Sequence, residues 1–448
     1  MLGATSKREL VPFGEAFRYW LRLGFINFGG PAGQIAIMHD ELVGRKRWIS
    51  NQRFLHALNY CMLLPGPEAQ QLAIYIGWLL NGTIGGIVAG VLFVLPAFVL
   101  ILVLSWTYVV HGDVTWVASI FYGLQAAVIA LVAAAVIRLG SRALRNPVLI
   151  AIAAAAFIAI FLIKVPFPLI VAAAAAVGII GWRWFPRIFE AEQARDEDSV
   201  IGDDSQTGRR RHPGRTLTVL AVGLLVWWGP LLVVTAIRGA DDTLSQQAIF
   251  FSQAAMVTFG GAYAVLSYIN QAAVEHFGWL EPGQMVDGMG LAESTPGPLI
   301  MVTEFVGFLG AYRFPGDLDP LVAGVLGATV TVWATFAPCF LWIFLGAPYI
   351  ERLRGNRALN AALSAVTATV VGVILDLAVS FGIVALFGRV RQGRAFGAMF
   401  PVPDMSSLDL FAAALSLAGF VALWRFRTNV LWVVSGSAAV GLIYRSFV

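Results

Sequence analysis

Two short motifs of this 448-residue chain place helix-breaking residues inside apolar segments. One is Phe28-Gly29-Gly30-Pro31, and the other is Pro65-Gly66-Pro67 followed by Glu68. Proline removes a backbone donor and glycine adopts conformations closed to other residues, so each motif predicts a break in a helix. A helix that begins after a break directs free N–H groups and the positive end of its dipole at its tip, which suits an anion. The alternative for any single motif is a packing kink.

Both motifs recur in the second half of the chain at one spacing. Phe259-Gly260-Gly261 and Pro296-Gly297-Pro298 follow their counterparts by 231 residues, and Trp279 follows Trp48 by the same number. Further along, the sequence VAGVL at 88–92 reappears at 322–326. These matches indicate an internal duplication, with up to four helix tips that could converge on one substrate.

Polar side chains near the motifs could complete such a site, because hydroxyl and amide groups donate hydrogen bonds to an oxyanion. The predicted substrate-binding residues, motif residues included, are Arg22, Asn27, Phe28, Gly29, Gly30, Gln34, Pro65, Gly66, Pro67, Gln70, Gln71, Thr258, Phe259, Gly260, Gly261, Ser294, Thr295, Pro296, Gly297 and Pro298. Ionisable groups inside a membrane are costly and therefore functional candidates. Glu68, Glu293 and Glu304 are candidates for proton coupling. A carboxylate at Glu68 would repel an anion unless it were protonated; the alternative is an acid that only caps its helix.

Other polar residues within apolar segments have competing interpretations. Arg18 and Arg22 are four residues apart and share a helix face. A guanidinium suits a tetrahedral dianion, and Arg22 is the deeper candidate, but both side chains could instead extend to the lipid headgroups. Gln125 and Asp376 could join helices rather than bind substrate.

Signatures of enzymes and of bound metals are missing from the sequence. It contains no Ser/His/Asp arrangement, nucleotide-binding loop, HExxH or CxxC. The five histidines are scattered, and the two cysteines, Cys61 and Cys339, lie in apolar stretches. No basic block with interleaved aromatics suggests a nucleic-acid partner. We therefore expect no catalytic residues, no metal, no cofactor and no nucleic acid.

The composition predicts a chain that crosses the lipid bilayer many times. Hydrophobic residues make up 58% of the sequence and charged residues 12%, about half the charge of a soluble domain. Apolar segments are expected at 13–37, 52–80, 84–110, 114–137, 147–163, 165–185, 216–237, 244–270, 284–311, 320–346, 358–387, 408–424 and 428–446. A polar stretch at 187–215 separates six segments from seven and reads as a solvated linker.

The number of segments predicts how the two halves are related. The segment 216–237 has no counterpart in the first half, and one extra crossing inverts the second repeat, the usual build of a secondary transporter. We expect a first repeat at 1–186, a linker with a connecting transmembrane helix at 187–243, and a second repeat at 244–448. The predicted fold is an all-α polytopic membrane protein with two six-segment inverted repeats.

The distribution of basic residues tests this topology, because cytoplasmic loops are enriched in Lys and Arg. Strict alternation from a cytoplasmic N-terminus leaves Arg45, Lys46, Arg47 and Arg53 outside. If the first two segments are re-entrant hairpins, these residues return to the cytoplasm, and the totals become 21 inside and 7 outside. The sequence thus predicts broken or re-entrant helices at the FGG and PGP motifs, entering from opposite faces, and a periplasmic C-terminus.

Two long stretches closely resemble the chromate ion transporter family: RLGFINFGGPAGQIAIMHDELVGRKRWIS at 22–50 and FLHALNYCMLLPGPEAQQLAIYIGWLLNGT at 54–83. FGG at 259–261 and STPGP at 294–298 are similar to the family's second copy of the motifs. The resemblance covers nearly the whole chain and implies the long, two-domain form of the family. It implies chromate efflux from the bacterial cytoplasm, chromate resistance, and sulfate as a structural mimic. The second half departs from the first at Leu299, which stands where the first has Glu68.

The expected function is secondary active efflux of chromate across the bacterial inner membrane by alternating access, with protons or sulfate as coupling candidates. The alternatives are a transporter of another anion, such as sulfate or an organic acid, and an anion channel. The expected partners are a chromate- or sulfate-like oxyanion and the bilayer. The oligomeric state stays open, a homodimer included.

Overall fold

The computed structural model describes residues 11–112, 114–184, 213–259, 261–346, 357–395 and 398–447. The predicted linker falls mostly outside these ranges. The first half contains α1 (Phe13–Ile26), α2 (Gly30–His39), the π-helical turn η1 (Asp40–Arg45), α3 (Asn51–Cys61), α4 (Glu68–His111), α5 (Thr115–Ala143), α6 (Pro147–Phe161) and α7 (Phe167–Trp184). The connecting helix is α9 (Pro213–Arg238).

The second half repeats this order of elements. It contains α10 (Thr243–Met256), α11 (Ala262–Asn270), the π-helical turn η2 (Gln271–His276), α12 (Gln284–Ser294), the 3₁₀ turn η3 (Leu299–Met301), α13 (Val302–Arg313), α14 (Pro320–Gly346), α16 (Arg357–Leu386), α17 (Leu410–Trp424) and α18 (Val430–Phe447). A π-helical turn follows the helix after each FGG motif, so even this rare feature recurs. Seven helices within the described residues are long and apolar enough to cross a membrane, and the protein is a helical, multi-pass membrane protein.

Helix α4 is a hairpin rather than one continuous span. Its backbone leaves the helical region at Asn81 and Gly82, where Gly82 has a φ of +67°. The limb before this break folds back on the limb after it: a Cβ added to Gly77 would lie 2.6 Å from the Cβ of Ala89. The same reversal in the second half separates α13 from α14. Glycine is therefore required here for two reasons: Gly82 adopts a positive φ, and Gly77 allows the two limbs to approach closely.

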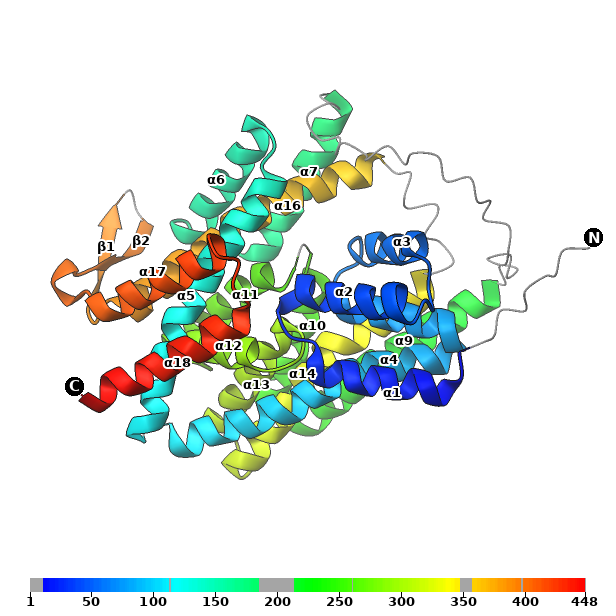
Figure 1. The fold of residues 1–448 in the computed structure, drawn as a ribbon, viewed down its shortest axis with the longest axis horizontal. Helices are drawn as coiled ribbons and strands as arrows, with labels where there is room; N and C mark the ends of the chain where they lie inside the picture. The colour runs from blue at the N-terminus through cyan, green and yellow to red at the C-terminus, as the bar shows by residue number, and fades with distance from the viewer. Residues whose placement is uncertain are drawn as a thin grey trace, which may run out of the picture.

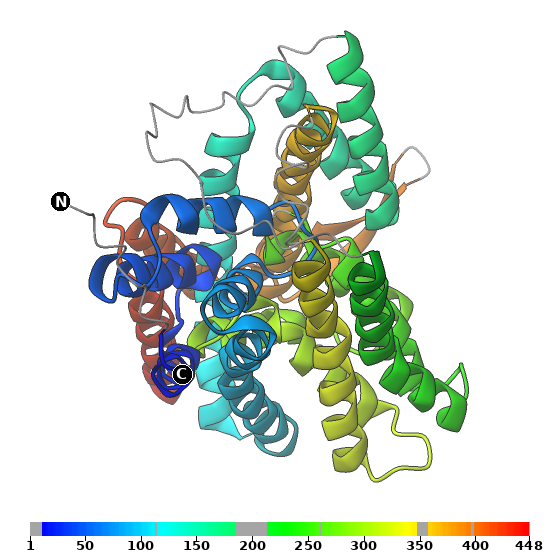
Figure 2. The ribbon, with the colours of Figure 1, turned by 90° about the vertical axis from the view of Figure 1, so that its right-hand side faces the viewer.

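The last three helices of each half pack against the other half (Figures 1 and 2). Helix α5 packs against α17 and α18, and α16 packs against α6 and α7; α5 and α16 also contact each other. Small residues allow the backbones to approach. Gly441 of α18 meets Gly123 of α5, and Gly178 of α7 meets Ala361 and Ala362 of α16. The halves are interlocked by this exchange, which helix patterns alone did not predict.

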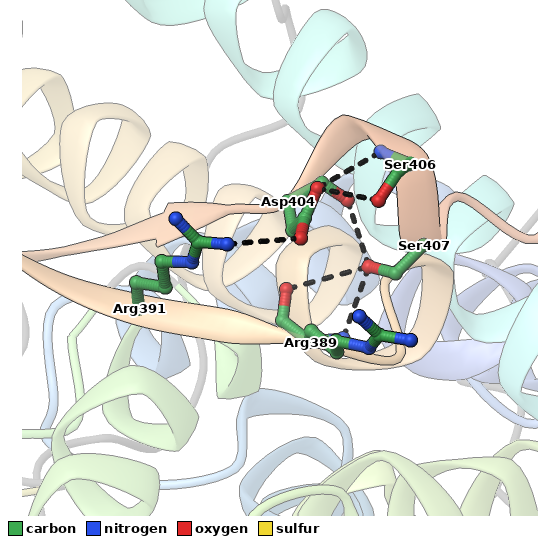
Figure 3. Close-up of polar contacts among 5 residues, drawn as sticks. All are labelled: Arg389, Arg391, Asp404, Ser406 and Ser407. Atoms are coloured by element: carbon green, nitrogen blue, oxygen red, sulfur yellow. Dashed lines mark hydrogen bonds and ion pairs between the residues drawn. The ribbon is translucent and has the colours of Figure 1, made fainter.

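One element lies outside the helical pattern that the sequence predicts. Strands β1 (Val390–Ala395) and β2 (Ala398–Pro403) form an antiparallel hairpin in register from Val390↔Pro403 to Ala395↔Ala398. The 3₁₀ turn η5 (Met405–Ser407) follows it. The hairpin projects at the left of Figure 1, and Figure 3 shows the polar contacts at its base.

Candidate functional site

The four predicted helix tips are joined by two backbone hydrogen bonds, and each half of the chain supplies one donor and one acceptor. The Gly66 N–H donates to the Thr258 carbonyl at 2.9 Å, and the Gly297 N–H donates to the Asn27 carbonyl at 3.3 Å. The two bonds are equivalent, because Thr258 and Gly297 follow Asn27 and Gly66 by 231 residues. Helix α2 also contacts α4, and α11 contacts η3. The two bonds join each PGP tip to the FGG tip of the other half, and we refer to the four tips together as the ring.

The tip glycines have conformations that other residues rarely adopt. Gly66 has a φ of +122° and Gly297 one of +126°, while Gly29 and Gly261 have φ of +89° and +105°. A side chain would be strained at each of these positions. Gly66 and Gly297 also lie close to equivalent positions of the opposite half, Cys339 of α14 and Ala97 of α4. The motif glycines are thus required by the geometry of the ring. Gly260 is outside the described residues.

Each tip is the start of a helix whose first N–H groups lack a side-chain cap. Helices α2, α4 and α11 and the turn η3 begin after Gly29, Pro67, Gly261 and Pro298 without such a bond. Helices α1, α5 and α12 also start without one, whereas α3, α6, α10 and α17 are capped by Ser50, Asn146, Asp242 and Asp409. The first N–H groups of a helix have no intrahelical acceptor. The ring therefore collects uncapped donors and positive dipole ends, an arrangement suited to an anion.

The amide side chains at the ring hold the backbone together. Gln34 is fully buried, and its Nε2 donates to the Asn27 carbonyl at 2.9 Å and to the Gly297 carbonyl at 2.6 Å. Gln71 Nε2 donates to the Pro65 carbonyl at 2.7 Å, and Asn27 Nδ2 to Phe93 at 3.3 Å. The oxygens of these amides accept no hydrogen bond within the described residues. Because the free ends are acceptors, the donors to an anion come from the backbone.

The remaining predicted polar residues differ in their surroundings. The hydroxyls of Thr258, Ser294 and Thr295 donate to carbonyls of their own helices. Gln70 is buried, and its Nε2 lies 3.5 Å from the Gly90 carbonyl oxygen. Arg22 is exposed on the outer face of α1 and is not brought to the ring. Arg18 shares that exposure, which fits headgroup contact.

The three acidic candidates differ in their burial and in their hydrogen-bond partners. Glu293 is buried, and Tyr263 donates to its Oε1 at 2.6 Å, joining α12 to the helix that follows the second FGG motif. Glu304 is fully buried, and neither carboxyl oxygen has a hydrogen-bond partner within the described residues. Glu68 is partly buried in the first turn of α4. An uncompensated buried charge is costly, so Glu304 is suited to a protonated form.

Sequence analysis missed one polar cluster. Asp287, in the first turn of α12, accepts hydrogen bonds from Tyr108 of α4 and Gln125 of α5. Ser267 similarly donates to Asp376 at 2.7 Å, so Gln125 and Asp376 do join helices. Asp287 lies within the apolar segment expected at 284–311, and only its pairing across the fold shows that it joins helices. No group of three or more His, Cys, Asp and Glu side chains that could hold a metal occurs within the described ranges.

Comparison with known proteins places the sequence in a family. The profile of the chromate transporter family matches residues 14–179 and 245–442. The chromate transport protein of Cupriavidus metallidurans is 31% identical over 98% of this chain and 95% of its own length. That of Pseudomonas aeruginosa is 31% identical over 97% and 94%. A probable chromate transport protein of Synechococcus elongatus is 30% identical over 82% and 83%. No solved structure is significantly similar.

Proposed function

We propose that this chain, which belongs to the chromate transporter family, exports chromate from the bacterial cytoplasm across the inner membrane. The ring of four helix tips carries the proposal. Chromate is a tetrahedral dianion, and uncapped N–H groups at helix starts bind such groups. Sulfate has the same shape and charge and would compete for the same donors. Export would keep the cytoplasmic chromate concentration low and so confer resistance.

Alternating access in this protein would rest on two re-entrant hairpin pairs. Contacts at the start of α1 support the first pair. Lys46 forms an ion pair with Glu15 at 3.1 Å, and Asn81 Nδ2 donates to the Val11 carbonyl at 2.9 Å. The chain is therefore at the same end of the molecule before α1, after η1 and at the α4 reversal. That is expected if two hairpins, α1–α2 and α3 with the first limb of α4, each enter the bilayer and return to the same face.

Equivalent contacts support the second hairpin pair. Arg313, at the end of α13, forms an ion pair with Glu281 at 2.7 Å, just before α12 begins. Arg238, at the end of α9, forms ion pairs with Asp242 and with Asp317 in the α13–α14 loop. The segment from α10 to α13 therefore also begins, turns and ends at one end of the molecule.

The two pairs enter from opposite faces if the second limb of α4 crosses the bilayer. This limb runs from the reversal at Gly82 to His111, long enough to span a hydrocarbon core of ~30 Å at ~1.5 Å per residue. Asn81 at one end contacts Val11, whereas Tyr108 at the other end donates to Asp287 at 2.8 Å. This supports inverted repeats, with the repeat boundaries at 1–186 and 244–448. The excess of basic residues then assigns the Val11 end to the cytoplasm.

The transport would be driven by an ion gradient, with Glu68, Glu293 and Glu304 as candidates for the coupled proton. Each lies in a helix that starts or ends at a tip of the ring. A protonated acid next to the ring would not repel a dianion, whereas a carboxylate would. Release of the proton on one side and its uptake on the other would couple the two fluxes.

Flux into proteoliposomes tests the proposal. Purified protein should move labelled chromate uphill when a pH gradient is imposed, and excess sulfate should reduce the flux. Downhill movement alone would indicate a channel and would overturn the proposal. Glu304→Gln should keep the fold and reduce uphill flux at least tenfold, whereas Arg22→Ala, on the exposed face, should change it by less than twofold.

A further inference from the structure

A cavity opens beside the first turn of α12, at the end of the molecule opposite Val11. It has a volume of about 660 Å³ and is lined by α4, α5, the loop before α12, α13 and α18. Asp287 lies in its wall and is 7% exposed. The cavity therefore brings solvent up to a wall that contains a nearly buried carboxyl group, on one of the proposed re-entrant helices.

Asp287 joins the second half of the chain to the first through neutral groups only. Tyr108 Oη donates to Asp287 Oδ2 at 2.8 Å, and Gln125 Nε2 donates to Oδ1 at 2.8 Å. Helix α12 is thereby bridged to both α4 and α5. If α12 moves away from these helices, the cavity deepens and both hydrogen bonds break. Helix α12 runs from this cavity to the second PGP tip, so Asp287, Tyr108 and Gln125 hold α12 against α4 and α5 at its cavity end, and we call this contact the outer gate.

The charged and titratable groups around the cavity have other partners. Arg313 is paired with Glu281 in the loop before α12. Arg445 of α18 lies over the Tyr122 ring at 4.7 Å, and the Tyr122 hydroxyl donates to Asp409 at 2.7 Å. Tyr312 of α13 completes this set. No ion pair compensates Asp287 within the part of the chain that the structure describes.

We propose that Asp287 binds a proton when this outer gate closes and releases it when the gate opens. Burying a carboxylate without a cation is costly, whereas the neutral acid is tolerated. The neutral acid also preserves the bridge, because its O–H can donate to the Gln125 oxygen after the amide turns, while Tyr108 donates to the other oxygen. In the open gate, water solvates the charged form. This inference rests on the proposed transport function and adds the link between external protons and the closed state.

Accessibility of a cysteine on the inner side of the gate tests the closure without measuring transport. Leu124→Cys is such a position: Leu124 of α5 is 4% exposed and lies against Gly290, three residues after Asp287 in α12, and both native cysteines are buried. A membrane-impermeant maleimide is applied to cells at external pH 5.5 and 7.5, and labelling is divided by that of Met405→Cys, an exposed site at the base of the hairpin. We expect the normalised labelling to be at least threefold lower at the acidic pH.

Three variants in the Leu124→Cys background separate the gate from other acid effects. Asp287→Asn mimics the neutral acid and should give the same low labelling at both pH values. Glu281→Gln, a matched carboxyl of the same cavity, should retain the response. Tyr108→Phe removes a hydrogen bond that Asp287 makes only in the closed gate, so the midpoint of closure should shift to lower pH by about one unit. A wild-type pH response in Asp287→Asn that elutes as folded protein, or an unshifted midpoint in Tyr108→Phe, would overturn the inference. A wild type that lacks chromate flux yet shows the labelling response would refute only the export proposal.

Discussion

Gln34, which the sequence predicts to contact substrate, holds the backbone of two tips together. Its amide donates to two buried carbonyls, one from each half of the chain, and so connects the first FGG tip to the second PGP tip. The side chain was identifiable from the sequence because a glutamine in an apolar segment needs a partner. Its partner Gly297 was not identifiable, because it is 263 residues away and only the fold brings it near.

Replacement of Gln34 should therefore weaken the ring measurably. Gln34→Leu removes two buried hydrogen bonds and leaves the Gly297 carbonyl without this donor, while the Asn27 carbonyl keeps the bond from the Gly297 N–H. We expect the free energy of unfolding to fall by about 2 kcal/mol. Gln70→Leu is the matched control: Gln70 is equally buried, but its contact with Gly90 is at the limit of a hydrogen bond at 3.5 Å. Unfolding of both variants in detergent would check this, and equal losses would contradict a special role for Gln34.

At the scale of elements, glycine and proline predicted the breaks, but not the way in which the limbs pack. The FGG and PGP tips follow from local backbone chemistry and were predictable at all four sites. The close approach of Gly77 to Ala89 depends on the reversal at Gly82, and the β1–β2 hairpin depends on the pairing of two strands of only six residues each. Such pairings carry little signal in a sequence whose strongest pattern is continuous apolarity.

The α4 hairpin gives a prediction about packing. Gly77→Ala places a Cβ 2.5 Å from the Gly85 carbonyl oxygen and 2.6 Å from Ala89, so the limbs must separate. We expect a loss of about 1–3 kcal/mol in the free energy of unfolding. Gly14→Ala in α1 is the control, since nothing lies within 4 Å of its added Cβ. The same destabilisation in both variants would argue against the tight reversal.

The base of the β-hairpin gives a prediction about pH. Asp404 accepts hydrogen bonds from the Ser406 N–H at 3.0 Å and hydroxyl at 2.8 Å, with Arg391 at 3.4 Å (Figure 3). The bonds from Ser406 are the main cause of a pKa of Asp404 below its usual value. A lowered pKa means that the carboxylate stabilises the hairpin above the unfolded pKa of about 4 and that this contribution disappears as the pH falls through the lower, folded value.

Hydrogen exchange of residues 390–407, corrected for the intrinsic rate, measures this contribution. The wild-type hairpin should be better protected at pH 7 than at pH 3, and Asp404→Asn should exchange faster than the wild type at pH 7 but like it at pH 3. Arg389 offers a control, because its backbone N–H, rather than its charge, donates to Ser407 at 3.0 Å; Arg389→Gln should leave protection unchanged. Protection independent of Asp404 would contradict the expected role.

For the whole molecule, the internal duplication could be predicted because the Gly, Pro and Trp residues of the motifs recur at one spacing. The packing of helices from one half against the other half could not be predicted from the sequence. Apolar surfaces of α5 and α16 can pack on many partners, and small residues such as Gly123 and Gly178 select the partner only through shape. The basic residues were more informative than the apolar ones. The basic residues at Arg45, Lys46, Arg47 and Arg53 predicted re-entry, and Lys46 forms an ion pair with Glu15 of α1. Re-entry into the bilayer stays a prediction.

The opposed entry of the hairpin pairs can be tested on the whole protein in cells. Arg53→Cys lies in the first turn of α3, where the second hairpin of the first pair begins. Glu281→Cys lies before α12, between the two hairpins of the second pair, and both positions are exposed. A membrane-impermeant maleimide should label Glu281→Cys in intact cells and Arg53→Cys only after the membrane is opened. Met405→Cys should follow Glu281→Cys, because two helices of the described chain, α14 and α16, lie between the α13–α14 loop and Met405, and two crossings return the chain to the side of Glu281. Labelling of Arg53→Cys and Glu281→Cys from one side would mean that the repeats are parallel, and a single gate could not then alternate about the ring.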